Sequence, residues 1–359
     1  MLAKRWFFNI LLLSGIMYSF VLAVNVLIDP YGVFRTNIVY LDKGFNERFL
    51  KIELLKQNKK RFNSYIFGSS RVGSTFPEII EQYIPGSRFY NFSVIYGNII
   101  DANKIASYLV ANEFPVKNIY FEIDMNAMSS KIPEDAHYEK QYNPDVEQTS
   151  RLLFYMQHLI IFPWGKMMRK VSNHFSDDKH GYYDLETGVM YRLSLDKKIA
   201  KDHELYIANT PSFHETNERT VKIEPEDYTL VMKSLKHLVQ LCDENGINLI
   251  LYTTPLNHNT MDKFTIDSAL RFIKDIANIH DVWYFSGYNS VTLDNHNYYE
   301  SSHYLYYVPR WIAGRIFDDK TVKVPSDFGV LLTKENIQKS EIGIKENMLQ
   351  YDREKKESH

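Results

Sequence analysis

The sequence of 359 residues has only one cysteine, Cys242. A single thiol excludes an internal disulfide framework and any CxxC metal or redox site. The chain also lacks a surplus of basic residues, because 42 Lys and Arg stand against 44 Asp and Glu. This balance argues against a nucleic-acid-binding protein. With 24% charged and 45% hydrophobic residues, the chain is neither disordered nor fibrous, and it can form the core of one large domain or two small ones.

Charged side chains are absent from residues 6–28. As a helix, this run is long enough to cross a hydrocarbon core of roughly 30 Å. Lys4 and Arg5 precede it, and positive charge stays on the cytoplasmic side, so we predict a single-pass anchor with its N-terminus inside and the rest exported. A cleaved signal peptide is the alternative, since residues 21–23 loosely fit a small-residue cleavage site. The apolar run continues past Ala23, which favours the uncleaved anchor.

The exported part alternates short apolar runs with helical patterns. Strands are indicated at 65–67, 88–92, 118–123, 247–252 and 282–285, and helices at 77–83, 99–111, 225–243 and 262–277. Pro225 suits the first position of the third helix, and Gly246 suits its C-terminal cap. Five strands that alternate with helices predict an α/β protein with a parallel sheet covered on both faces. Ligand chemistry in such sheets lies at the carboxyl ends of the strands.

A second apolar run, at residues 152–162, spans eleven residues, too few to cross a bilayer. Its length favours a buried helix of an insertion subdomain. The alternative is a helix in the membrane interface, with Trp164 and the basic residues Lys166, Arg169 and Lys170 as anchors.

The predicted organisation has five parts. After Lys334 the chain is rich in Lys and Glu, which predicts a solvated helix or partly disordered tail. The parts are residues 1–28 as cytoplasmic tip and transmembrane anchor, 29–128 and 225–330 as two halves of the α/β domain, 129–224 as a partly helical insertion, and 331–359 as a charged tail.

The first block with chemical potential is YIFGSSR at residues 65–71, a strand that runs into a small-residue turn. A serine there lies at the carboxyl end of the first strand, where a nucleophile is exposed. Ser69 or Ser70 could instead cap the following helix. A phosphate loop is a third interpretation, but Ser74 stands where such loops need a lysine.

Three further blocks follow predicted strands. The second is residues 90–97, whose backbone N–H groups could serve an oxyanion, and in the third Asp124 and Asn126 follow the third strand. In the fourth, Glu300 stands three residues before His303.

A metal site at His303 with His296 and Asp294 is the alternative interpretation of the fourth block. No cysteine in this block, and no second histidine at helical spacing from His303, supports that interpretation. We therefore expect neither a metal nor a cofactor.

In their order and spacing, these blocks resemble the SGNH (GDSL-type) hydrolase superfamily. The chain is more closely similar to the membrane-anchored, SGNH-like proteins of bacterial cell envelopes, a group that includes the D-alanyl transfer protein of lipoteichoic acid synthesis and the alginate acetylation proteins. The segments that carry this similarity are DPYGVF at 29–34, FGSSR at 67–71, SHY at 302–304 and DFGV at 327–330. The resemblance covers about residues 29–128 and 225–330. It implies a three-layer α/β/α sandwich with a parallel, flavodoxin-like, five-stranded sheet.

Carried over residue by residue, the resemblance implies Ser70 as nucleophile and His303 as its base. Glu300 stands where the family has an aspartate that orients the histidine. A serine hydroxyl is a poor nucleophile until an imidazole takes its proton, and the imidazole needs a carboxylate to hold its tautomer.

The other implied site residues bind the oxyanion or the substrate. Gly97 matches the oxyanion donor of the second block, which also contains Ser93. The usual Gly-x-Asn-Asp of the third block is absent, and Asn126 is the nearest candidate. Arg71, which replaces the leucine of the enzyme signature, is expected to bind an anionic group of the substrate.

The resemblance thus implies serine-dependent acyl transfer or ester hydrolysis outside the bacterial inner membrane, on a cell-envelope polysaccharide or lipid-linked glycan. An acyl-Ser70 intermediate would pass its acyl group to a sugar hydroxyl or to water. A multi-span membrane O-acyltransferase is the expected partner. The alternative is an inactive SGNH-like scaffold or glycan-binding subunit, which Glu300 and the missing third-block signature suggest.

Overall fold

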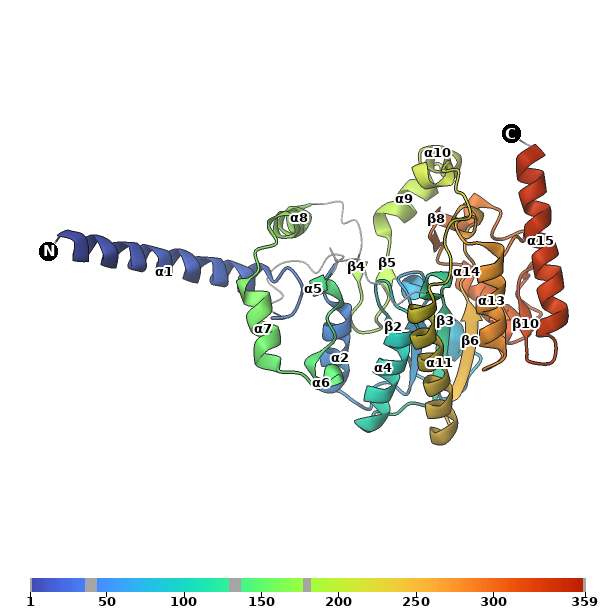
Figure 1. Cartoon of the computed structure of the whole chain (residues 1–359), viewed down its shortest axis with the longest axis horizontal. Helices are drawn as coiled ribbons and strands as arrows, with labels where there is room; N and C mark the ends of the chain where they lie inside the picture. The colour runs from blue at the N-terminus through green and yellow to red at the C-terminus, as the bar shows by residue number, and fades with distance from the viewer. Residues whose placement is uncertain (1, 36–43, 129–136, 177–181, 358–359) are drawn as a thin grey trace. The chain divides into compact units, whose positions relative to one another are not determined.

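The computed structural model (Figure 1) describes residues 2–35, 44–128, 137–176 and 182–357. The chain forms two compact units. The first unit comprises residues 1–57, 133–183 and 191–194, and the second comprises 58–132, 184–190 and 195–359. This division differs from the predicted one. Residues 29–35 and 44–57 belong with the N-terminal helix, because they pack on helices of the predicted insertion, as Phe49 does on Phe154. Residues 184–190 and 195–224 of that insertion belong with the sheet.

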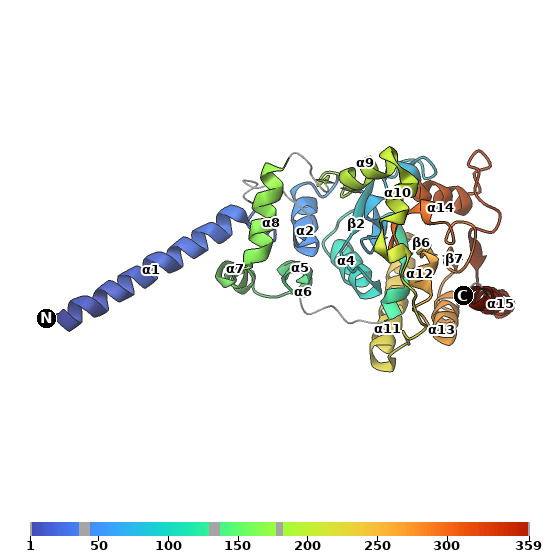
Figure 2. The ribbon, with the colours of Figure 1, turned by 90° about the horizontal axis from the view of Figure 1, so that it is seen from above.

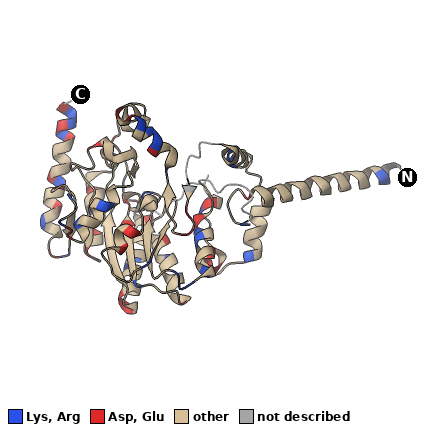
Figure 3. Ribbon diagram, turned by 180° about the vertical axis from the view of Figure 1, so that it is seen from behind, with Lys and Arg blue, Asp and Glu red and all other residues tan. Residues whose placement is uncertain are grey.

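The first unit begins with α1, Leu2–Ile28, which is long and apolar enough to span a membrane, as predicted. In Figure 3, charged residues colour only the N-terminal end of α1. The other helices of this unit are α2 Glu47–Gln57, α5 His137–Lys140, α6 Pro144–Glu147, α7 Arg151–Ile160 and α8 Trp164–Phe175.

A tight loop follows α1 at the DPYGVF segment. Asp29 has a positive φ of 47°, and its carboxylate accepts hydrogen bonds from the backbone N–H groups of Val33, Phe34 and Arg35 at 2.8, 3.1 and 2.8 Å. The loop buries Val33 in one cluster with Phe49 of α2. The segment therefore serves to return the chain onto the helices beside α1.

The second unit is built on a six-stranded sheet in the order β10-β7-β6-β3-β1-β2. Five strands are parallel, and β10 runs antiparallel to β7 at the edge. The strands are β1 Ser64–Gly68, β2 Phe89–Ser93, β3 Asn118–Ile123, β6 Asn248–Thr253, β7 Val282–Tyr284 and β10 Val330–Leu332. This confirms the α/β class and the five predicted strands. The expectation of a five-stranded sheet was wrong, because β10 adds a sixth strand. With only three residues, β10 gives a weak signal in the sequence.

Helices lie on both faces of the sheet. On one face α11 contacts α4 and α13, while α3 and α14 pack together on the other, and Figure 2 shows α14 across the strands from α11 and α13. These helices are α3 Glu78–Glu81, α4 Ile99–Ala111, α11 Pro225–Asn245, α13 Ile266–Ala277 and α14 Val308–Ile316. Helix α11 begins at Pro225 and is capped by Gly246 with a φ of 61°, as the sequence predicted.

The remaining elements connect these layers. They are α9 Leu193–Lys201, α10 His203–Ala208, α12 His258–Met261, α15 Ile337–Glu357, the short strands β4 Tyr182–Tyr183, β5 Met190–Tyr191, β8 Tyr298–Glu300 and β9 His303–Tyr304, and the 3-10 turns Val72–Ser74, Met125–Met128, Pro211–Phe213 and Asn295–Asn297. The predicted tail forms α15, which is not merely solvated, because Tyr351 stacks on Tyr288 with ring centroids 3.8 Å apart.

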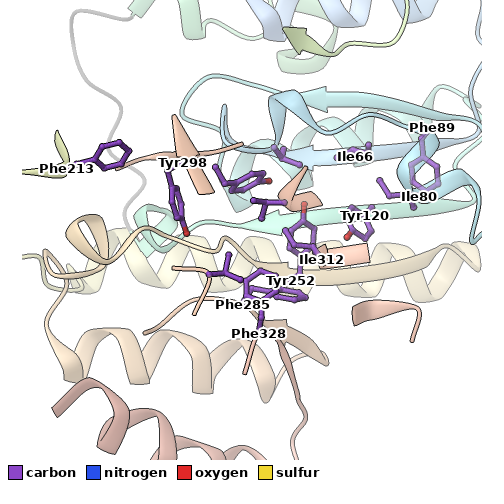
Figure 4. Packing of buried hydrophobic residues seen from close by; sticks show 14 residues of the cluster. Ile66, Ile80, Phe89, Tyr120, Phe213, Tyr252, Phe285, Tyr298, Ile312 and Phe328 are labelled. Carbon is purple, nitrogen blue, oxygen red and sulfur yellow. The ribbon is translucent and has the colours of Figure 1, made fainter. Parts of the chain in front are cut away.

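The core between the sheet and α14 is rich in aromatic residues. Ile66, Tyr120 and Tyr252 from three neighbouring strands pack in one cluster with Ile312 of α14 and Phe328, as Figure 4 shows. This packing fixes the central strands, at whose carboxyl ends the predicted site residues lie.

Candidate active site

Ser70 lies where the order of the parallel strands reverses. Numbered along the chain, the five parallel strands have the order 2-1-3-4-5, in which β1 pairs with both β2 and β3. Ligands of such sheets bind in the crevice at this switch point, outside the carboxyl ends of the strands. Gly68, with a φ of 152°, ends β1, and a Cβ there would lie 2.7 Å from Val72. Glycine thus permits the sharp turn that presents Ser70.

His303 and Glu300 come from the short antiparallel hairpin of β8 and β9, in which they are directly paired. The Ser70 Oγ lies 2.9 Å from Nε2 of His303. The other ring nitrogen, Nδ1, contacts a carboxylate oxygen of Glu300. The second carboxylate oxygen accepts a hydrogen bond of 2.7 Å from the Ser302 N–H. The imidazole therefore stands between a hydroxyl and a carboxylate, an arrangement that can move a proton from the serine.

The side chain of Arg71 is largely buried and is engaged by the protein. Its guanidinium pairs with Asp124, which follows β3. Its Nε donates a hydrogen bond of 2.8 Å to the carbonyl oxygen of Ser302, next to His303. The predicted role, binding of a substrate anion, would have to compete with these partners. In this structure Arg71 positions the turn of Ser70 relative to the histidine hairpin.

The backbone N–H groups of the predicted oxyanion residues Gly97 and Asn126 are engaged within the protein. The N–H of Gly97 donates to the Val94 carbonyl at 2.8 Å, and a Cβ on Gly97 would lie 2.3 Å from the Gly68 oxygen. Asn126 is exposed, and its N–H donates to Asp124 at 2.9 Å. In the described part of the chain, neither Gly97 nor Asn126 forms a hydrogen bond with Ser70. The structure thus brings together Ser70, His303, Glu300 and Arg71. It also packs Gly97 against the Gly68 carbonyl at the start of the same turn, and it links Asn126 to Arg71 through Asp124.

Ser93, the other predicted site residue, is fully buried at the end of β2. Its N–H donates to the side-chain oxygen of Asn91 at 3.0 Å. The amide of Asn91 donates in turn to the carbonyl oxygens of Val72 and Thr75, both at 2.9 Å. Asn91 therefore holds the turn after Ser70, a role that sequence reasoning missed. In the sequence, the signal for this role was a polar asparagine inside the apolar run of a predicted strand.

Glu122 is a second residue that sequence reasoning missed. It lies within β3, is fully buried, and accepts a hydrogen bond of 2.6 Å from the Tyr304 hydroxyl, next to His303. Burial raises the pKa of Glu122 to about 7, against the opposing effects of the Tyr304 bond and the charge of Arg71. In the sequence, the signal for Glu122 was an acidic residue inside the apolar run of residues 118–123. A carboxyl that can be neutral near pH 7 is therefore bonded to Tyr304, the residue that follows His303.

The alternative metal ligands face a different part of the unit. His296 hydrogen-bonds to Asp294 at 2.8 Å and to Glu204 at 2.9 Å. Among the described residues, no group of three or more His, Cys, Asp or Glu side chains is arranged to hold a metal ion.

Ser70, His303 and Glu300 supply the hydroxyl, base and orienting carboxylate that serine acyl chemistry requires. The contacts among these three side chains are the structural support for this chemistry. A scan of the chain against protein-family models finds no matching family, and a search of curated proteins finds no similar sequence.

Proposed function

We propose that this protein is an extracytoplasmic serine esterase or O-acyltransferase that acts on a cell-envelope glycan or lipid-linked glycan. The observation that carries the proposal is the 2.9 Å contact between the Ser70 hydroxyl and His303, whose other ring nitrogen is held by Glu300. The apolar helix α1 supports an envelope location, since it is long enough to anchor the chain in a membrane.

In the proposed reaction, Ser70 Oγ attacks the carbonyl carbon of an ester while its proton passes to Nε2 of His303. Glu300 stabilises the imidazolium that forms. The C–O bond to the leaving alcohol then breaks, and Nε2 returns the proton to that alcohol. A sugar hydroxyl or water next attacks the acyl-Ser70 carbonyl and gives its proton to Nε2. Release of Ser70 Oγ, which takes that proton back, completes the cycle.

One observation favours a second candidate, an inactive scaffold or glycan-binding subunit. A tetrahedral oxyanion needs fixed donors, each worth about 2.7–4 kcal/mol when removed. The Gly97 N–H is already bonded to the Val94 carbonyl, and the Asn126 N–H to the Asp124 carboxylate. Turnover would therefore require donors other than these two, or a shift of the Gly97 turn.

The test uses full-length protein in detergent, a serine-reactive phosphonate and a small neutral ester. Labelling should occur at Ser70 and disappear in Ser70→Ala and His303→Ala. Glu300→Gln should lower ester turnover by about 10²–10⁴-fold, because His303, the general base, loses the carboxylate that orients it and stabilises its imidazolium. Ser69→Ala is the matched control, because Ser69 is the buried neighbour in the same turn and should leave labelling largely intact.

Wild-type protein that is folded but neither labels nor cleaves any small ester would overturn the enzymatic proposal. The scaffold would replace it if Ser70→Ala cells kept the wild-type phenotype while deletion of the whole chain changed it.

A further inference from the structure

Helix α7 of the first unit presents apolar side chains to the outside. Leu152, Met156 and Ile160, spaced four residues apart on one face, are 69, 48 and 57% exposed. On the opposite face Phe154 and His158 are buried. Of the five exposed positions of α7, only Gln157 is polar. The expectation of a buried helix at 152–162 thus holds for one face only.

The next helix, α8, repeats this pattern. Trp164, Met168 and Phe175 fall on one helical stripe and are 60, 48 and 79% exposed. Met167 and Lys170, which lie off this stripe, are buried. We call the exposed side chains of Leu152, Met156, Ile160, Trp164, Met168 and Phe175 the apolar face.

Both helices are tied to the end of the candidate membrane helix. The side-chain amide of Asn25, in the last turn of α1, donates to the Leu159 carbonyl at 2.7 Å and also to the Ile161 carbonyl. The Lys170 ammonium donates to the carbonyl oxygen of Asp29, directly after α1. Figures 1 and 2 show α7 and α8 beside this end of α1. The apolar face therefore lies where the chain would leave a bilayer.

The composition of this segment is compatible with a lipid surface, because residues 151–176 contain no Asp or Glu. Of its four basic residues, Arg151 pairs with Glu53 and Asp145, Lys166 pairs with Glu139 and Lys170 is buried, whereas Arg169 is exposed beside the apolar face. Trp164 stacks on Phe162 with ring centroids 5.8 Å apart, and both side chains are exposed. Amphipathic helices with basic and aromatic residues lie in the membrane interface, and tryptophan is enriched at that depth.

We propose that the apolar face of α7 and α8 lies in the bilayer interface beside α1, so that this unit contacts lipid through three helices. The bilayer is the occupant because the face adjoins α1, which is exposed to its surroundings along most of its length. This inference rests on insertion of α1 and is independent of the chemistry at Ser70.

The test is depth-dependent fluorescence quenching of the full chain in vesicles of phosphatidylcholine and phosphatidylglycerol. Met156→Cys and Trp164→Cys, in a Cys242→Ser background, carry an environment-sensitive label. Leu230→Cys on α11 is the matched control, because Leu230 and Met156 are both 48% exposed. Lipid carrying a nitroxide near its headgroup should quench both test labels at least about two-fold more strongly than the control label.

Quenching of the two test labels that is no stronger than that of the control label would overturn the proposal, because the apolar face would then lie no nearer the lipid headgroups than α11. A label at Leu12 of α1 reports insertion. If that label is not quenched by nitroxides deep in the bilayer, α1 is not inserted and the inference fails with it. Ser70→Ala should leave every quenching value unchanged, which separates this result from the proposed function.

Discussion

At the residue scale, the contacts of Arg71 allow two proposed roles to be separated, positioning of Ser70 and binding of a substrate anion. The structure commits its guanidinium to Asp124 and to the Ser302 carbonyl. A lysine is a point charge that cannot reproduce this fork of donors, so Arg71→Lys should misplace Ser70 relative to His303. We expect kcat for a neutral ester to fall about ten- to hundredfold with little change in KM.

Steady-state kinetics on one neutral and one anionic ester test this expectation. A positioning residue lowers kcat for both esters equally. If instead KM rises for the anionic ester alone, Arg71 binds a substrate anion, as the sequence first predicted.

Glu122 predicts a pH dependence of stability. Its pKa is about 7 in the folded protein and near 4.5 in the unfolded chain. The folded state therefore holds the proton more tightly, and this contribution to stability, complete below pH 4.5, is lost as the pH rises to about 7. The Glu122→Gln variant has no carboxyl to ionise and does not lose this stability. Its free energy of unfolding relative to wild type should therefore increase between pH 4.5 and about 7, by up to about 3 kcal/mol.

Denaturant unfolding at several pH values measures this difference. Tyr304→Phe is the companion variant. It removes the hydrogen bond that lowers the Glu122 pKa, and should extend the window to higher pH. A stability difference between Glu122→Gln and wild type that is the same at pH 5 and pH 8 would refute the buried-carboxyl interpretation.

At the scale of single elements, α4 is started by a reciprocal cap directly after the Gly97 turn. The Asn98 side chain accepts hydrogen bonds from the N–H groups of Ile100 and Asp101, and the Asp101 carboxylate accepts from the Asn98 N–H. Asn98→Ala should cost about 1 kcal/mol of unfolding free energy. Asn278→Ala is the control, because Asn278 is exposed at the end of α13. Thermal or denaturant unfolding measures both, and equal losses would contradict the capping role.

At the scale of the whole molecule, the chain combines an apolar N-terminal helix with a sheet unit that carries the serine site. Extraction of the full-length protein from membranes should require detergent, because α1 is uncharged from Trp6 to Ile28. Protease added outside the inner membrane should digest the sheet unit. Recovery of a soluble mature form that begins near Val24 would show that the helix is a cleaved signal.

Local patterns determined much of the architecture. Apolar runs bounded by turn residues located β1, β2, β3, β6 and β7, and Pro225 and Gly246 located the ends of α11. These features depend on neighbours in the chain, so the sequence alone determines them. The same holds for the charge-free run of α1 and for the position of Ser70 after the first strand, although the roles of the site residues came from a family resemblance.

Only the tertiary structure decided which of these residues meet. Ser70 and His303 are 233 positions apart, and their contact depends on strand order and on the pairing of β8 with β9. The partners of Arg71, the burial of Glu122, the pairing of β10 and the docking of α15 likewise depend on distant segments. The physical reason is that periodicity specifies which face of an element is apolar, whereas the partner of a polar side chain is set by the packing of elements far apart in the chain.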